Sequence, residues 1–132
     1  MGLLRTAHTV QAEVESRLGA LGLSLPKLLA LKALSDAGES LPLGQLADRL
    51  ACVKSNITQL VDRLEADGFV ARKADVSDRR TRLAVLTAAG RKAGTAGTRI
   101  QQDTERELLT TLTPDEAQQL AVLLEKVGRD PG

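Results

Sequence analysis

Apolar residues recur at helical spacing in several separate stretches of this 132-residue chain. The clearest case is Ile57, Leu60, Val61 and Leu64, which stand at i, i+3, i+4 and i+7 and therefore share one face of an α-helix. Similar patterns elsewhere indicate that most of the chain is helical. The predicted helices cover residues 4–18, 24–38, 43–50, 54–68, 87–112 and 113–127.

Two of these helices begin with marked capping signals. Ser24 offers a side-chain oxygen to free backbone N–H groups, and Pro26 is tolerated in the first turn. In "TPDE", Thr113 is placed to cap, Pro114 fits the first helical position, and Glu116 can return a bond to the Thr113 N–H. We expect a capping box at the start of the last helix.

The helices over 43–50 and 54–68 are short and separated by only a few residues, which is the pattern of a helix-turn-helix. The face of the second helix opposite its apolar stripe is polar. This face consists of Ser55, Asn56, Gln59, Asp62 and Arg63. Such residues suit a surface that reads hydrogen-bond donors and acceptors, and a merely solvated helix face is the alternative.

After Gly68 the period of the pattern changes. The segments "FVARKA" and "TRLAVLT" are short and partly β-branched, and "DVSD" between them is rich in turn-forming residues. A β-hairpin is predicted, with Asp78, Arg79 and Arg80 at its tip, projecting beyond the helices as a wing. The expected fold is mainly α with a small β-hairpin wing (α+β).

Three glycines stand at helical spacing inside the predicted helix over 87–112: Gly90, Gly94 and Gly97. Each costs a helix about 1 kcal/mol relative to alanine, so tertiary packing has to hold this helix. Two interpretations stay open, close approach of a neighbouring helix and a compliant hinge.

The distribution of charged residues along the chain indicates which part could bind an anionic partner. The net charge is only +1, but the segment from Lys54 to Lys92 has nine basic and five acidic residues, which makes it the candidate anion-facing surface.

A single cysteine and a single histidine argue against an enzyme, a metal site or a cofactor site. Phe69 is the only aromatic residue, so the chain has no platform for stacking unpaired bases and is a poor fit to single-strand nucleic-acid binders and RNA-recognition sheets. No apolar run is long enough for a membrane span, and a cytoplasmic location is expected.

The run from Leu41 to Gly90 resembles the winged helix-turn-helix core of the MarR (multiple antibiotic resistance regulator) family of bacterial transcription factors. The segments "LVDRLEADGFV" and "DVSDRRTRLAVLTAAG" carry the resemblance most specifically. It implies one domain over residues 1–132, with a DNA-binding core at 24–92 and dimerisation helices at 1–20 and 100–128. The implied function is a homodimeric regulator, usually a repressor, that binds a pseudo-palindromic operator in double-stranded DNA. Many members of the family release DNA when a small-molecule effector or an oxidant acts on them.

The resemblance also implies roles for single residues. Arg80 would enter the minor groove, Asp78 would orient the arginines, and Arg79 would pair with acidic groups or phosphate. Gln59 is the best candidate for reading a base. The implied recognition-helix set is Lys54, Ser55, Asn56, Thr58, Gln59 and Arg63, of which Lys54 and Arg63 would bind phosphate.

Some positions depart from the family pattern. Pro42 stands where a Thr or Ser often caps the first helix of the motif, and Ser77 stands where another wing arginine is common. Cys52 has two interpretations, an oxidant-sensing thiol and a small buried apolar residue. For the whole protein, a winged helix used as a protein-interaction module without specific DNA binding is the alternative function.

Overall fold

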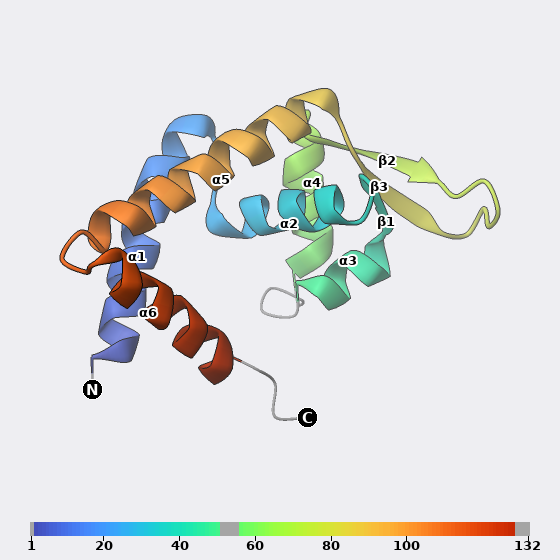
Figure 1. Ribbon diagram of the computed structural model, residues 1–132. Coiled ribbons are helices and arrows are strands. Elements are labelled where there is room, and N and C mark those ends of the chain that lie inside the picture. The colour runs from blue at the N-terminus through green and yellow to red at the C-terminus, as the bar shows by residue number, and fades with distance from the viewer. Residues whose placement is uncertain (1, 51–55, 129–132) are drawn as a thin grey trace.

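A computed structural model describes residues 2–50 and 56–128 (Figure 1). Six α-helices, a short 3-10 helix and three strands occupy these residues. The helices are α1 (Leu3–Leu18), α2 (Leu25–Asp36), α3 (Leu43–Arg49), α4 (Ile57–Ala66), α5 (Ala88–Leu108) and α6 (Pro114–Val127), with the 3-10 helix η1 (Gly19–Leu21) after α1. The strands are β1 (Ser40–Pro42), β2 (Val70–Ala74) and β3 (Arg82–Leu86). The predicted fold, mainly helical with a β wing, is confirmed.

The sheet has one strand more than predicted. β2 and β3 form the expected antiparallel hairpin, and β1 pairs with the other edge of β3 to give the order β1-β3-β2. β1 has only three residues, ends in Pro42, and finds its partner about forty residues later in the chain. So short a segment has no alternating pattern to read, which is why the sequence does not reveal it.

The caps follow the predicted chemistry. The Ser24 hydroxyl accepts the Lys27 N–H at 3.3 Å. At the start of α6 both bonds of the capping box are present, from Glu116 N–H to the Thr113 hydroxyl at 3.2 Å and from Thr113 N–H to Glu116 Oε1 at 2.9 Å. Pro42 precedes α3 and provides no side-chain cap, as its place in the sequence suggests.

α5 ends earlier than predicted, at Leu108 rather than near Leu112. Thr113 has an extended backbone, with ψ of 162°, because it caps α6 and precedes Pro114. The chain therefore has to leave the helix before that residue, and it turns through Leu109–Leu112, with the Leu112 N–H donating to Leu109 O at 3.0 Å.

The hydrophobic core surrounds α2, which lies in the middle of the molecule (Figure 1). Leu28, Leu31 and Leu34 are each at most 1% exposed. Helices α1, α3, α4 and α5 and the sheet all pack against this helix. The position of the recognition motif is thus set by contacts with one central buried helix.

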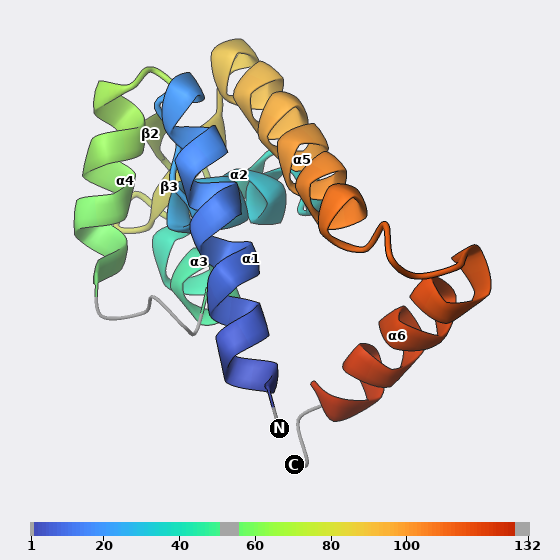
Figure 2. The same ribbon diagram turned by 90° about the vertical axis from the view of Figure 1, so that its left-hand side faces the viewer.

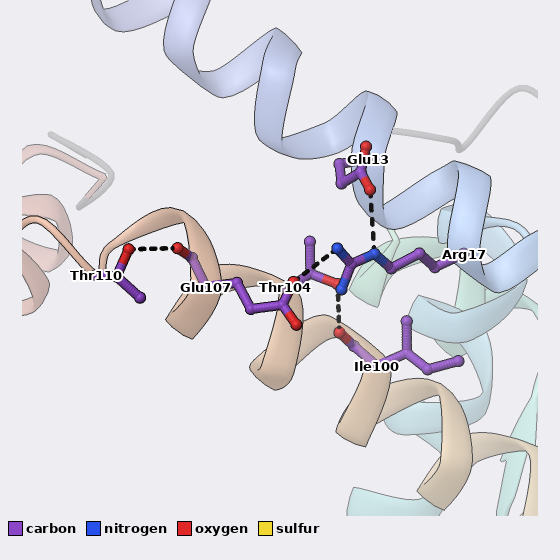
Figure 3. A network of polar contacts seen from close by, with 6 residues as sticks. All are labelled: Glu13, Arg17, Ile100, Thr104, Glu107 and Thr110. Carbon is purple, nitrogen blue, oxygen red and sulfur yellow. Dashed lines mark hydrogen bonds and ion pairs between the residues drawn. The ribbon is translucent and has the colours of Figure 1, made fainter.

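α1 and α5 are also joined by polar contacts (Figure 3). Arg17 on α1 binds Glu107 on α5, with 2.6 Å between Nη2 and Oε2, and it binds Glu13 at 3.1 Å. These hydrogen bonds, first to Glu107 and then to Glu13, raise the pKa of the Arg17 guanidinium. Beside them the buried Thr104 hydroxyl donates to Ile100 O at 2.7 Å, so it has a partner.

After the turn that follows α5, α6 doubles back beneath the rest of the molecule and stands apart from it (Figures 1 and 2). None of its fourteen residues, all of them described, is buried. Its apolar side chains are open to solvent, and so is the N-terminal end of α1, where Leu4 is 85% exposed.

No single helix in the ranges 2–50 and 56–128 has the length and apolar composition needed to cross a bilayer. The segments Leu3–Leu21 and Leu25–Asp36 meet that test only together, as a pair bent by 76°.

Candidate nucleic-acid interface

α4 separates its apolar and polar residues in the way the sequence predicts. Leu60, Val61 and Leu64 are at most 8% exposed and hold the helix on the core. The residues predicted to contact DNA that the structure describes all lie on the exposed side of the helix or at its start: Asn56, Thr58, Gln59 and Arg63. Lys54, Ser55 and Cys52 lie outside the described residues, so their predicted roles stay predictions.

The C-terminal end of α4 is fixed on two sides. Gly68 adopts a left-handed conformation with φ of +80°, and the Phe69 N–H reaches back to Leu64 O at 2.9 Å. Lys27 at the start of α2 binds Asp67, with 2.7 Å between Nζ and Oδ2. The end of the predicted recognition helix is thereby anchored to the core helix.

The wing tip is shaped by two aspartates. Asp78 accepts the Arg80 N–H at 3.0 Å through Oδ1 and the Thr81 hydroxyl at 2.9 Å through Oδ2. Asp75 accepts both the N–H and the hydroxyl of Ser77, at 3.0 and 2.9 Å. Both carboxylates are therefore used to hold the loop. The contact of Asp78 is with the Arg80 main chain, and its predicted role in orienting the arginine side chains stays a prediction.

Arg79 and Arg80 are both exposed at this tip. Within the described residues neither guanidinium makes an ion pair or a hydrogen bond. The acidic partner considered for Arg79 is thus not found among these residues. Both residues belong to the loop of a hairpin that projects from the rest of the molecule (Figure 1), and their exposed side chains are accessible to an anion.

One residue that sequence reasoning missed links the wing to α4. Arg72 on β2 binds Asp62 at 2.7 Å and Glu65 at 3.0 Å, and its guanidinium also donates to Thr58 O at 3.3 Å. The hydrogen bond with Asp62 is the main reason why the pKa of the Arg72 guanidinium is raised. The available signal was two carboxylates three residues apart on α4, followed by an arginine on the next strand.

Comparison with known proteins identifies this architecture. Residues 23–81 match the model of the MarR family. The HTH-type transcriptional repressor Rv2887 of Mycobacterium tuberculosis (strain ATCC 25618 / H37Rv) is 31% identical over 128 residues, which are 97% of this chain and 91% of that protein. The chain belongs to the MarR family.

Two solved structures of the MarR protein itself are also similar to this family member. The mutant MarR from E. coli complexed with operator DNA superimposes with a TM-score of 0.80 at 27% identity, covering 98% of this chain and 95% of that one. The reduced form of MarR from E. coli gives a TM-score of 0.82 at 28% identity, covering 98% of both chains.

Membership decides between the classes of function considered above. This MarR-family chain is a DNA-binding transcriptional regulator, and the family is one of regulators rather than enzymes. Within the described ranges no three His, Cys, Asp or Glu side chains gather in a group that could hold a metal ion.

A cleft of about 390 Å³ lies between α2 and α5 of this regulator, beside the end of β3. Leu31 and Leu86 provide apolar contact surface. Its charged lining consists of Lys32, Arg91, Arg99 and Asp36, so cations outnumber anions three to one. Arg91 is paired with Glu39 at 3.0 Å, whereas Lys32 and Arg99 have no ion pair in the part of the chain that the structure describes.

Proposed function

We propose that this protein is a cytoplasmic, homodimeric repressor that binds a pseudo-palindromic operator through one winged helix-turn-helix per protomer. The observation that carries the proposal is the pairing of an exposed polar face on α4 with a projecting wing whose two arginines are unpaired within the described residues. A major-groove helix with a flanking minor-groove arginine uses both features. The relative Rv2887 is named a repressor, which supports the direction of control.

In this proposal residues 24–92 form the DNA-binding core. Gln59 reads a base edge, Asn56, Thr58 and Ser55 contact bases or phosphate, and Arg63 with Lys54 binds phosphate. Arg80 enters the minor groove on each side of the operator, and Arg79 contacts phosphate.

Residues 1–20 and 100–128 form the dimer interface. The support is an unpartnered apolar surface on the terminal helices, which we call the terminal patch: Leu3, Leu4, Val122, Leu123, Leu124 and Val127, each at least 49% exposed. An exposed apolar patch of this kind typically marks an interaction site. Two copies joined through it would hold two wings on one duplex.

A random pool of duplex DNA tests the function. We expect the retained fragments to share two inverted half-sites spaced by about one helical turn, ~10 base pairs, or a multiple of it. Light scattering at micromolar concentration should give the mass of two chains. Leu123→Glu should shift the mass to one chain, whereas Ala121→Glu, which adds the same charge on the far side of α6 from Leu123, should not. Retained fragments without a shared sequence would contradict binding to a specific operator, and a monomeric wild type would contradict the dimer.

We also propose that a small organic anion binds in the cleft between α2 and α5. Its excess of cations favours a carboxylate over a neutral ligand of the same shape. In calorimetric titrations we expect benzoate to bind about fivefold more tightly than phenol, the size of one partly exposed ion pair. Arg99→Gln should remove that preference, whereas Lys92→Gln, outside the cleft lining, should keep it. Equal binding of both compounds to the wild type would contradict the assignment.

A further inference from the structure

We propose that Arg72 is a positioning residue for DNA recognition, which holds the first turn of α4 in register with the wing without touching DNA itself. The inference rests on the proposed function, because it assigns a role within the same DNA-binding surface. It concerns a residue on β2 that is outside the set predicted to contact DNA.

Arg72 is placed to join two elements. β2 is an edge strand, and the Arg72 N–H donates to Glu65 Oε2 at 3.3 Å rather than to a neighbouring strand. Its guanidinium donates to Glu65 Oε1 at 3.0 Å, to Asp62 Oδ1 at 2.7 Å and to Thr58 O at 3.3 Å. One side chain therefore spans α4 from its first turn to its last.

These contacts place the Arg72 guanidinium beside the predicted base-reading residues. Thr58 itself and Gln59 next to it belong to that set, and Arg72 binds the main chain of this turn. The apolar stripe of Leu60, Val61 and Leu64 holds α4 from the core side only. The Arg72 contacts hold it from the wing side, so rotation of the helix about its own axis is opposed on two sides. A binding residue keeps its geometry when such neighbours support it.

The same contacts neutralise a carboxylate on the surface predicted to meet DNA. Asp62 belongs to the face predicted to meet DNA, and its side chain is 59% exposed. An unpaired carboxylate there would repel phosphate. Arg72 neutralises it, and because the guanidinium is already bound to three acceptors and its side chain is only 24% exposed, it is not available as a phosphate contact.

The experiment compares specific and non-specific affinity. Wild type, Arg72→Gln, Arg72→Lys and the charge-matched control Lys92→Gln are titrated with the selected operator and with a scrambled duplex, each over a range of salt. For Arg72→Gln we expect the operator affinity to fall about tenfold, a coupling of the size seen between residues in one network. Affinity for the scrambled duplex should change by less than about threefold, and the salt slope should stay within about 0.5 of wild type because no phosphate contact is lost. Lysine keeps the positive charge but lacks the planar guanidinium that binds several acceptors at once, so the operator affinity of Arg72→Lys should lie between those of wild type and Arg72→Gln.

A second variant keeps the inference testable if Arg72→Gln does not fold. Asp62→Asn combined with Glu65→Gln leaves Arg72 in place but removes its acidic partners. Affinity for the scrambled duplex should rise, because two negative charges are gone, while the ratio of specific to non-specific affinity should fall. A role in stability alone would change the melting temperature and leave that ratio unchanged.

The measurements distinguish failure of this inference from failure of the proposed function. Equal losses on both duplexes, with a salt slope reduced by about two because the homodimer would lose the contact twice, would mean that Arg72 contacts phosphate, which overturns the inference. Unchanged ratios in both variants would overturn it as well. A wild-type protein that does not discriminate between the duplexes would instead overturn the proposed function.

Discussion

Replacing Gly90 by alanine is expected to destabilise the protein by about 2–3 kcal/mol, the cost of forcing extra volume into a packed site. A Cβ atom at this position would lie well inside van der Waals contact with the Phe69 carbonyl oxygen and 2.9 Å from Leu86 Cδ1. The Phe69 carbonyl oxygen belongs to the main chain, so it cannot move aside by a side-chain rotation. Phe69 O already accepts the Thr87 N–H at 3.1 Å, so displacing it would also disturb the start of α5.

The other glycines of α5 provide matched controls. At Gly94 a Cβ would meet Leu31 Cβ at 3.4 Å, an ordinary contact, so Gly94→Ala should gain up to about 1 kcal/mol of helix propensity. At Gly97 the nearest atoms are the methyl ends of Leu28 and Leu23, at 2.8 and 3.0 Å, which can shift. Gly97→Ala should therefore lie between the other two in stability.

Thermal unfolding at one fixed protein concentration would measure this series, because a dimer's melting temperature depends on concentration. For a chain of this length the Gly90→Ala loss corresponds to a fall of roughly 10 °C. Equal stabilities for Gly90→Ala and Gly94→Ala would contradict the packing argument. The hinge interpretation would then regain support, since the close approach observed at Gly90 and Gly97 would have no energetic consequence.

The sequence predicts the elements whose signal is local. The apolar stripe of α4, the capping box at Thr113 and the hairpin of β2 and β3 each depend on residues that are close together in the sequence, and all three are present. Features that depend on distant partners were missed. β1 exists because β3 offers it an edge, and its three residues have no pattern of their own.

The candidate site also contains residues that local sequence could predict and one whose role depends on distant partners. Exposure of Gln59 and Arg80 follows from their places on an amphipathic helix and at a hairpin tip, so the sequence could predict it. The role of Arg72 could not be read in this way, because it needs the angle at which β2 crosses α4. Until that angle is known, Asp62 looks like an unexplained acidic residue on a DNA-facing surface. With it, the carboxylate has a partner at 2.7 Å.

The largest effect on DNA binding is expected from Arg80→Ala. Loss of one specific arginine contact costs about 1–3 kcal/mol, and a homodimer loses it at two wings, so operator affinity should fall by at least about 30-fold. The structure gives no reason for a loss of stability, because the Arg80 side chain is exposed and has no partner among the described residues. Its N–H bond to Asp78 is a backbone contact and survives the substitution.

Gel-shift titrations of folded protein at several salt concentrations would measure this loss. Arg82→Ala removes an equal charge from the base of the same hairpin, on β3, and serves as the control for net charge. Arg80→Lys distinguishes charge from shape, since a lysine keeps the charge but is a poorer fit to a narrow minor groove. If Arg80→Ala and Arg82→Ala weakened binding equally and by only a few-fold, the wing would contribute general positive potential, and specificity would have to come from α4 alone.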